Sequence, residues 1–274
     1  MGKIILTEAD SMAMVVGLFV TAVPINFGWW WAHRNKNEPV RVDRVSYLYI
    51  VIQAALSVTA IFLLWYGIKL IDPTIGAFFS RFEVLIVVFL GIWIFKERFK
   101  PMEAIGAFIL LSGLFVIRYQ AGIDVSQGMF IILSSTVFFG TSEIIAKRIV
   151  RAVEPNLFAL MRNTHILIFI TIAALIDGKL NFSYLGSYYY LVPIAGFLGP
   201  GLGRPMYLHA LSHLEISKVS TLNQLQPVAV ALLAYFTIGT IPGLKEWIGG
   251  AMMIIGGITM IRGRYRNKRA PDIT

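Results

Sequence analysis

Long apolar segments separated by short polar loops dominate the sequence. A helix needs about 20 residues to cross the hydrocarbon core of a bilayer, and several segments of that length contain no Asp, Glu, Lys or Arg. When one or two ionisable residues are tolerated, the pattern predicts nine transmembrane helices, over residues 11–33, 45–68, 73–95, 99–117, 125–146, 156–176, 180–213, 219–244 and 246–261. No ten-residue alternation of polar and apolar residues indicates a transmembrane strand. The expected fold is all-α, a polytopic transmembrane helix bundle.

Composition supports a membrane protein and excludes several kinds of chemistry. Hydrophobic residues make up 57% of the chain and charged residues only 14%, whereas an average soluble domain is about a quarter charged. Because the chain has no cysteine, disulfides, thiolate nucleophiles and cysteine metal sites are excluded. The G-x-G-x-G pattern at residues 199–203 lies inside an apolar segment with no preceding strand, so we do not interpret it as a dinucleotide site. We expect no metal and no cofactor.

The net charge of +9 reflects loops rather than a nucleic-acid-binding surface. Lys and Arg gather in short segments between the apolar runs, and such loops stay on the cytoplasmic side of a membrane. The first apolar run has no small-residue cleavage site, so we interpret it as a mature span. The sequence predicts a multi-pass protein of the cell membrane with no nucleic-acid partner. Its C-terminus is expected in the cytoplasm because of the basic tail, with Arg262, Arg264, Arg266, Lys268 and Arg269.

Among the ionisable residues within the apolar segments, we single out three arginines and two glutamates, namely Arg81, Glu83, Glu143, Arg162 and Arg204. A charge in the bilayer core costs roughly 2.5 to 3.5 kcal/mol on insertion scales, so it normally faces a partner or a wet passage. Arg81, Glu83 and Arg204 lie deep in their spans and are candidate substrate-binding residues. Glu143 and Arg162 lie toward the cytoplasmic ends of adjacent spans, where they can form an ion pair or a coupling site. Snorkelling to the interface is the alternative for these two.

Helix-breaking residues gather around Arg204. This density predicts an opened or kinked helix whose freed backbone groups line a cavity. Tyr207, Asn223 and Gln226 supply neutral hydrogen-bonding groups near the same depth, so we include them among the candidate substrate-binding residues. The alternative is that they bond one helix to another. The helix breakers are Pro193, Gly196, Gly199, Pro200, Gly201, Gly203 and Pro205.

Two of the four histidines, His165 and His209, lie inside predicted spans rather than at their last residue. Imidazole titrates near neutral pH, so either histidine can carry a proton in a coupled transport cycle. A proton or another coupling ion is therefore an expected partner. The alternative is that each histidine is a packed, hydrogen-bonded residue of the bundle.

An internal repeat divides the chain into residues 1–120 and 121–274. A shift of 143 residues brings Glu103 onto Glu246, and Gly106 and Gly113 onto Gly249 and Gly256. Glycines seven apart lie on one helix face, where they let two helices approach closely. We favour this packing role over contact with a substrate. Two repeats with a site between them near the midplane are typical of secondary transporters.

The chain resembles the drug/metabolite transporter superfamily, EamA type. The resemblance rests on the run from Gly201 to Leu211 (GLGRPMYLHAL), on Ile216–Ser220 with Leu225-Gln226-Pro227, and on Phe95–Phe99 followed by Gly106 and Gly113. It implies a helical bundle of two pseudo-symmetric repeats, usually ten helices in two sets of five. It also implies export of amino acids, related metabolites or drugs.

Two departures from this family pattern stand out. In the repeat register Thr240 replaces the glutamate at Glu97, so the function of this acid is expected in one half only. The predicted spans number four and then five, and the run 11–33 aligns with the second helix of the repeat. The first helix of the first repeat is therefore expected to be missing.

These features together predict a permease that exports or exchanges a small metabolite by alternating access. Three arginines against two glutamates within the spans favour a substrate with a carboxylate or another anionic group. We expect no enzyme, because no H-E-x-x-H, G-x-S-x-G or P-loop pattern occurs. A non-transporting sensor or scaffold, or a truncated remnant, is the first alternative, and an embedded enzyme using Glu83 or Glu143 is the second. The sequence leaves open whether the protein forms a homodimer. The expected cavity lining is Arg81, Glu83, Arg204, Tyr207, Asn223 and Gln226.

Overall fold

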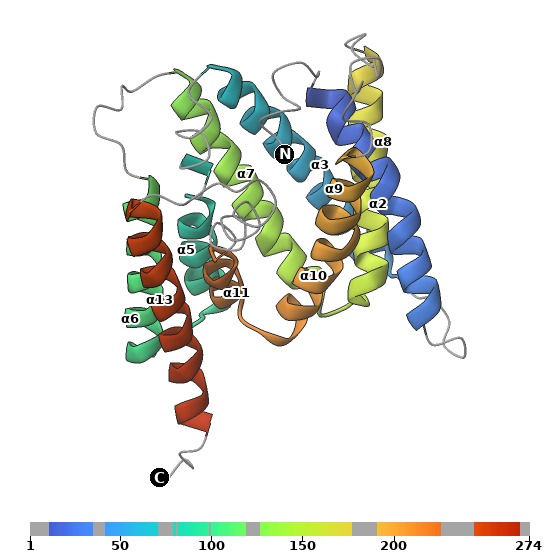
Figure 1. The fold of residues 1–274 in the computed structure, drawn as a ribbon. Coiled ribbons are helices and arrows are strands. Elements are labelled where there is room, and N and C mark those ends of the chain that lie inside the picture. Colours follow the sequence, from blue (N-terminus) through green and yellow to red (C-terminus); the bar gives the residue numbers. More distant parts are fainter. Residues whose placement is uncertain are drawn as a thin grey trace.

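The protein is a bundle of α-helices (Figure 1). The structure, a computed structural model, describes residues 11–34, 42–70, 79–80, 82–98, 100–118, 127–176, 191–225 and 244–268, and no strand occurs among them. A π-helix, η2 (Phe197–Gly203), joins two of the α-helices. The α-helices are α2 (Ser11–His33), α3 (Arg44–Leu70), α5 (Glu83–Phe95), α6 (Pro101–Arg118), α7 (Gln127–Ile149), α8 (Pro155–Ile176), α9 (Leu191–Gly196), α10 (Arg204–His213), α11 (Ile216–Asn223) and α13 (Leu244–Lys268).

Helix length and apolar composition fit a membrane protein. Among the described helices, α2, α3, α7 and α8 are long and apolar enough to cross a membrane, and shorter apolar helices lie within α5, α6 and α13. The predicted all-α bundle is confirmed. Several predicted spans are described only in part, chiefly because residues 71–78, 177–190 and 226–243 lie outside the described residues. Large apolar side chains cover the outside of the bundle, including Phe89, Trp93, Phe108, Phe115 and Trp247.

Each long helix packs against partners that are distant in the sequence. Helix α3 packs along α7, and α2 packs along α8 and η2. One buried apolar core lies among α3, α7, α8, α10 and α11, around Phe158, Leu208 and Leu211. A second lies among α2, α3 and α8, around Phe19, Val58 and Ile166. These cores hold α3, α7, α8 and α10 around the centre of the molecule.

Helices α6 and α13 cross at the repeated glycines. A Cβ added to Gly113 would lie 2.6 Å from Gly249 O, and one added to Gly256 would lie 2.6 Å from Gly106 O. Gly106 meets Gly256 while Gly113 meets Gly249, so the two helices run antiparallel. Under the 143-residue repeat, Gly106 corresponds to Gly249 and Gly256 to Gly113, so the contact Gly106–Gly256 becomes the contact Gly113–Gly249. Inverted repeats related by a pseudo-two-fold axis produce this exchange. The glycines serve the helix packing that the sequence favoured.

Basic residues of the α7 end, Lys147, Arg148 and Arg151, lie at one end of the bundle. The Arg148 guanidinium lies 5.0 Å from the Tyr49 ring centre, and that of Arg151 lies 5.5 Å from the Phe95 ring centre. The end of α7, the start of α3 and the end of α5 therefore share this side. The α10–α11 connection and the C-terminal end of α13 lie at the bottom of Figure 1. We call this side, with Lys147, Arg148 and Arg151, the basic face.

Asp43 caps the first turn of α3 beside the basic face. Its Oδ2 accepts hydrogen bonds from the amides of Val45 at 3.1 Å and Ser46 at 3.0 Å. Hydrogen bonding from Ser46, first through its side chain, lowers the pKa of the Asp43 carboxyl below its ordinary value of 3.8. A charged carboxylate at this position stabilises the start of the helix.

Candidate functional site

A buried group of amide and hydroxyl side chains joins α3 to α7 in the middle of the bundle. Gln53 and Ser57 are about one turn apart on α3, they face Ser142 on α7, and all three are fully buried. Gln53 Nε2 donates to Ser142 Oγ at 2.8 Å, and the two serine hydroxyls lie 2.8 Å apart. Buried polar groups are costly unless they are hydrogen-bonded. This group therefore favours one alignment of α3 against α7.

Arg162 on α8 reaches the same polar group. Its Nη2 donates to Ser57 Oγ at 3.2 Å, and its Nη1 donates to Asn163 Oδ1 at 2.8 Å. Both acceptors are neutral, although the side chain is buried. Buried charges are normally paired, because removing a charge from water is expensive. Arg162 is thus a buried positive charge that is positioned by neutral groups.

Two asparagines hold the π-helix η2. Pro205 at the start of α10 has no amide hydrogen, so it cannot donate to the carbonyls of Pro200 or Gly201, which lie five and four residues earlier. Asn163 Nδ2 donates to Pro200 O at 2.9 Å and to Asn26 Oδ1 at 2.6 Å. Asn26 Nδ2 in turn donates to Gly201 O at 2.5 Å. The π-helical turn agrees with the predicted opening of this helix, but side chains from α2 and α8 bond the carbonyls that were predicted to line a cavity.

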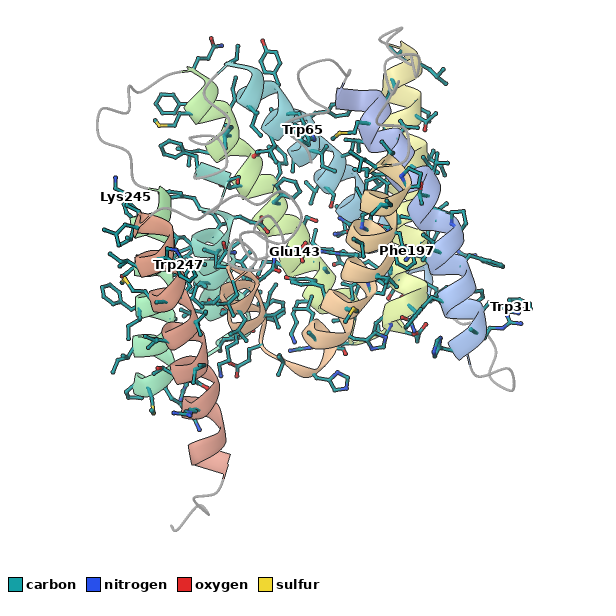
Figure 2. The ribbon with its side chains drawn as sticks, viewed as in Figure 1. Trp31, Trp65, Glu143, Phe197, Lys245 and Trp247 are labelled. Carbon is teal, nitrogen blue, oxygen red and sulfur yellow. The ribbon has the colours of Figure 1, made fainter. Side chains whose placement is uncertain are left out.

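Arg204 follows η2 directly and faces α7. Its Nη1 donates to Glu143 Oε1 at 2.7 Å, and its guanidinium lies 5.1 Å from the centre of the Tyr207 ring. Glu143 therefore forms its ion pair with Arg204, and not with Arg162, which the sequence allowed as a partner. Arg204 extends from the start of α10 to the α7 carboxylate, whereas the Arg162 guanidinium bonds toward α3. Figure 2 shows Glu143 in the middle of the bundle and Trp31 and Trp247 at its outer edges.

Several buried polar atoms at this centre have no hydrogen-bond partner among the described residues. The guanidinium groups of Arg162 and Arg204 both interact electrostatically with Glu143, and Arg162 also with Arg204. Arginine presents its N–H groups in a fork that matches a carboxylate or phosphate. The arrangement can therefore bind an anionic group between the two guanidinium groups. The atoms without a partner are Gln53 Oε1, Glu143 Oε2, Arg162 Nε, Arg204 Nε and Arg204 Nη2.

The remaining candidate substrate-binding residues divide into three cases. Glu83 is the half-buried first residue of α5 and interacts electrostatically with Arg204. Asn223 is exposed at the end of α11, so the structure does not bring it to the buried centre. Arg81 and Gln226 lie outside the described residues. The structure thus brings Glu83, Arg204 and Tyr207 together with Glu143 and Arg162.

Both candidate coupling histidines are hydrogen-bonded to neighbouring helices. His165 Nδ1 donates to Met161 O at 2.7 Å, and its Nε2 lies 3.0 Å from the Tyr47 hydroxyl. His209 Nε2 lies 3.1 Å from Asn156 Oδ1. These contacts fit the packing interpretation, and a proton-coupling role stays a prediction. Among the described residues, no three His, Asp or Glu side chains lie together where they could hold a metal.

Sequence reasoning missed the neutral part of this centre, namely Gln53, Ser57, Ser142, Asn26 and Asn163. One sequence feature was available. Gln53 and Ser57 are four residues apart in an apolar helix, so they share one face. Polar residues at this spacing in a span indicate a side that faces protein rather than lipid.

These features define a polytopic helical membrane protein with a charged, hydrogen-bonded interior. Residues 1–119 and 126–262 match the model of the EamA-like transporter family. The chain therefore belongs to this family, and it is a membrane transporter of the drug/metabolite type. The predicted resemblance is confirmed.

A known crystal structure shares the fold. It superposes with a TM-score of 0.78 over 93% of this chain and 90% of the other, at 16% sequence identity. At this level of identity the likeness shows the fold alone. No curated protein matches the chain by sequence.

Proposed function

We propose that this protein is a permease that exports or exchanges a small anionic metabolite by alternating access. It works in the cell membrane with its C-terminus in the cytoplasm, and residues 1–120 and 121–274 form the two halves that move. Carboxylates, acidic amino acid-like compounds and acidic drugs are the candidate substrates. A proton or another ion is the candidate coupling partner.

The observation that carries the proposal is the partly bonded guanidinium pair. Arg162 donates hydrogen bonds only to neutral acceptors. Arg204 donates to Glu143 through one nitrogen, Nη1. Three nitrogen atoms of the pair have no hydrogen-bond partner among the described residues. Because Arg162 has no hydrogen-bonded acid among the described residues and a buried charge is costly, an anion that fills this place gains charge-assisted hydrogen bonds.

The surrounding groups favour reversible rather than permanent anion binding. Glu143 and Glu83 are the described carboxylates near Arg204. They offset part of the positive charge, and Glu143 competes with a substrate carboxylate for Arg204. A carrier must release its substrate, so partial compensation fits transport better than a site with two unopposed arginines would.

Flux measurements with purified protein in liposomes test the proposal. Labelled carboxylates, acidic amino acids and neutral analogues are offered with and without a pH gradient, and the internal product is identified by mass spectrometry. At least one acid should enter chemically unchanged. Replacing Arg162 or Arg204 by Gln should lower its rate by about tenfold or more, because one set of charge-assisted bonds is lost.

Arg148→Gln is the matched control, because Arg148 is an exposed arginine of the basic face. Its flux should equal that of the unaltered protein. Equal flux in the Arg162 and Arg204 variants would refute the anion site. A chemically changed product would favour an enzyme instead.

A further inference from the structure

Glu97 of the first repeat caps a helix of the second. Its Oε1 accepts from the Ile216 amide at 2.8 Å, and its Oε2 accepts from the Ser217 amide at 3.0 Å and from Ser217 Oγ at 2.5 Å. The helix α11 makes no capping bond of its own through Glu215. A carboxylate at a helix N-terminus interacts favourably with the unpaired amides and with the helix dipole. Glu97 is therefore the cap of α11.

The local backbone aims Glu97 at this target. Lys96 has a φ of 55°, which is a left-handed conformation that residues other than glycine seldom adopt. It ends α5 and turns the chain so that Glu97 lies against the start of α11. Helices α5 and α11 lie side by side in Figure 1. Gly91 leaves the space, because a Cβ there would overlap the Ser217 hydroxyl. A strained residue is kept where the surrounding structure requires it.

A second contact lies beside the cap and also joins the two repeats. Lys218 Nζ lies 3.0 Å from Glu103 Oε1, and both side chains are buried. The other Glu103 oxygen accepts from the Lys100 amide at 3.0 Å, which holds the carboxylate at the start of α6. Glu97, Glu103, Ser217 and Lys218 form one unit, which we call the closing cluster.

The repeat register gives the closing cluster only a partial counterpart on the opposite face, because Glu246 repeats Glu103 while the capping acid and the lysine are not repeated. Shifting by 143 residues places Thr240 at the position of Glu97 and Ile75 at the position of Lys218. Inverted repeats place equivalent segments on opposite membrane faces. A carboxylate cap and an ion pair are thus encoded for the basic face only.

We propose that the closing cluster holds the transporter shut at the basic face and makes this its resting state. The inference rests on the proposed alternating-access function. Opening the basic face separates α11 from the α5–α6 turn, which uncaps α11 and divides Lys218 from Glu103. Opening the opposite face breaks no comparable cap or ion pair. The conformation that is closed at the basic face therefore has the lower free energy.

Thiol labelling tests this directly, because the chain has no cysteine of its own. Ser220→Cys introduces one thiol at a buried position of α11, one turn beyond the capped end. Vesicles of both orientations are treated with a membrane-impermeant maleimide. Adding Glu97→Gln should raise the labelling rate from the basic face about tenfold or more, because charge-assisted hydrogen bonds are weakened.

Two further variants make the result decisive. Lys218→Gln should also raise the labelling rate from the basic face. It provides the test if the Glu97 variant does not fold. Glu215→Gln is the matched control, since this half-exposed acid precedes α11 and pairs with Lys218 of the same repeat, and among the described residues it forms no ion pair with the first repeat. It should leave labelling unchanged.

Unchanged labelling in folded Glu97 and Lys218 variants would overturn the inference. An equal rise from both faces would also overturn it, because that indicates general loosening. Labelling requires no substrate, so the result is independent of the anion site. If Arg162→Gln abolishes flux while the labelling shift persists, the closing cluster and the anion site are separately supported.

Discussion

Glu143 on α7 and Arg204 on α10 form a 2.7 Å ion pair whose side chains are only 8% and 14% exposed. The pair joins two helices that are 61 residues apart at these positions. It leaves Glu143 Oε2 and two Arg204 nitrogens without a hydrogen-bond partner among the described residues. One hydrogen bond therefore joins the two side chains, while Glu143 Oε2, Arg204 Nε and Arg204 Nη2 are available to bind a substrate group.

Breaking the pair should destabilise the protein strongly. Removing one partner of a buried ion pair costs about 3 to 5 kcal/mol, because the other charge stays behind unpaired. Glu143→Gln and Arg204→Gln should each lower the free energy of unfolding, measured by denaturant titration in detergent. The double variant should cost less than the sum of the two single variants. Strict additivity would show that the two residues do not interact.

The glycine crossing of α6 and α13 predicts a position-dependent effect of alanine. A Cβ at Gly256 would overlap the Leu110 backbone nitrogen, so Gly256→Ala should destabilise the fold by about 1 to 3 kcal/mol. Gly28→Ala in α2 is the control, because nothing lies within 4 Å of its added Cβ. It should be neutral or stabilising by up to about 1 kcal/mol. Equal thermal stability of both variants would contradict the close crossing.

The cap of α3 predicts a specific pH dependence. Because folding lowers the pKa of Asp43 below 3.8, its contribution to stability is present above that pH and is lost as pH falls through the folded value. Asp43→Ala should therefore lower the melting temperature at neutral pH, and the difference should shrink toward pH 3. Asp43→Asn keeps an uncharged cap that does not titrate. The difference in melting temperature between Asp43→Asn and Asp43→Ala should therefore not depend on pH.

The sequence predicted the helices and the buried charges better than it predicted their partners. Arg162, Arg204 and Glu143 were recognisable because a charge inside an apolar span is expensive. Their pairing depends on which helices meet, and the turn of η2 brings Arg204 rather than Arg162 to Glu143. The cap of α11 by Glu97 spans 119 residues of sequence, and no spacing rule predicts such a contact. Gln53 and Ser57 were predictable from their shared helix face.

The central claim is that Arg162 and Arg204 bind the anionic group of the substrate. Melting temperatures of the purified protein, measured with pairs of carboxylic acids and their neutral amides, test it most directly, because a ligand raises stability in proportion to its binding. At least one acid should raise the melting temperature while its amide does not, and Arg162→Gln should remove the shift. A shift of the same size for acid and amide, or one that persists in Arg162→Gln, would contradict the claim.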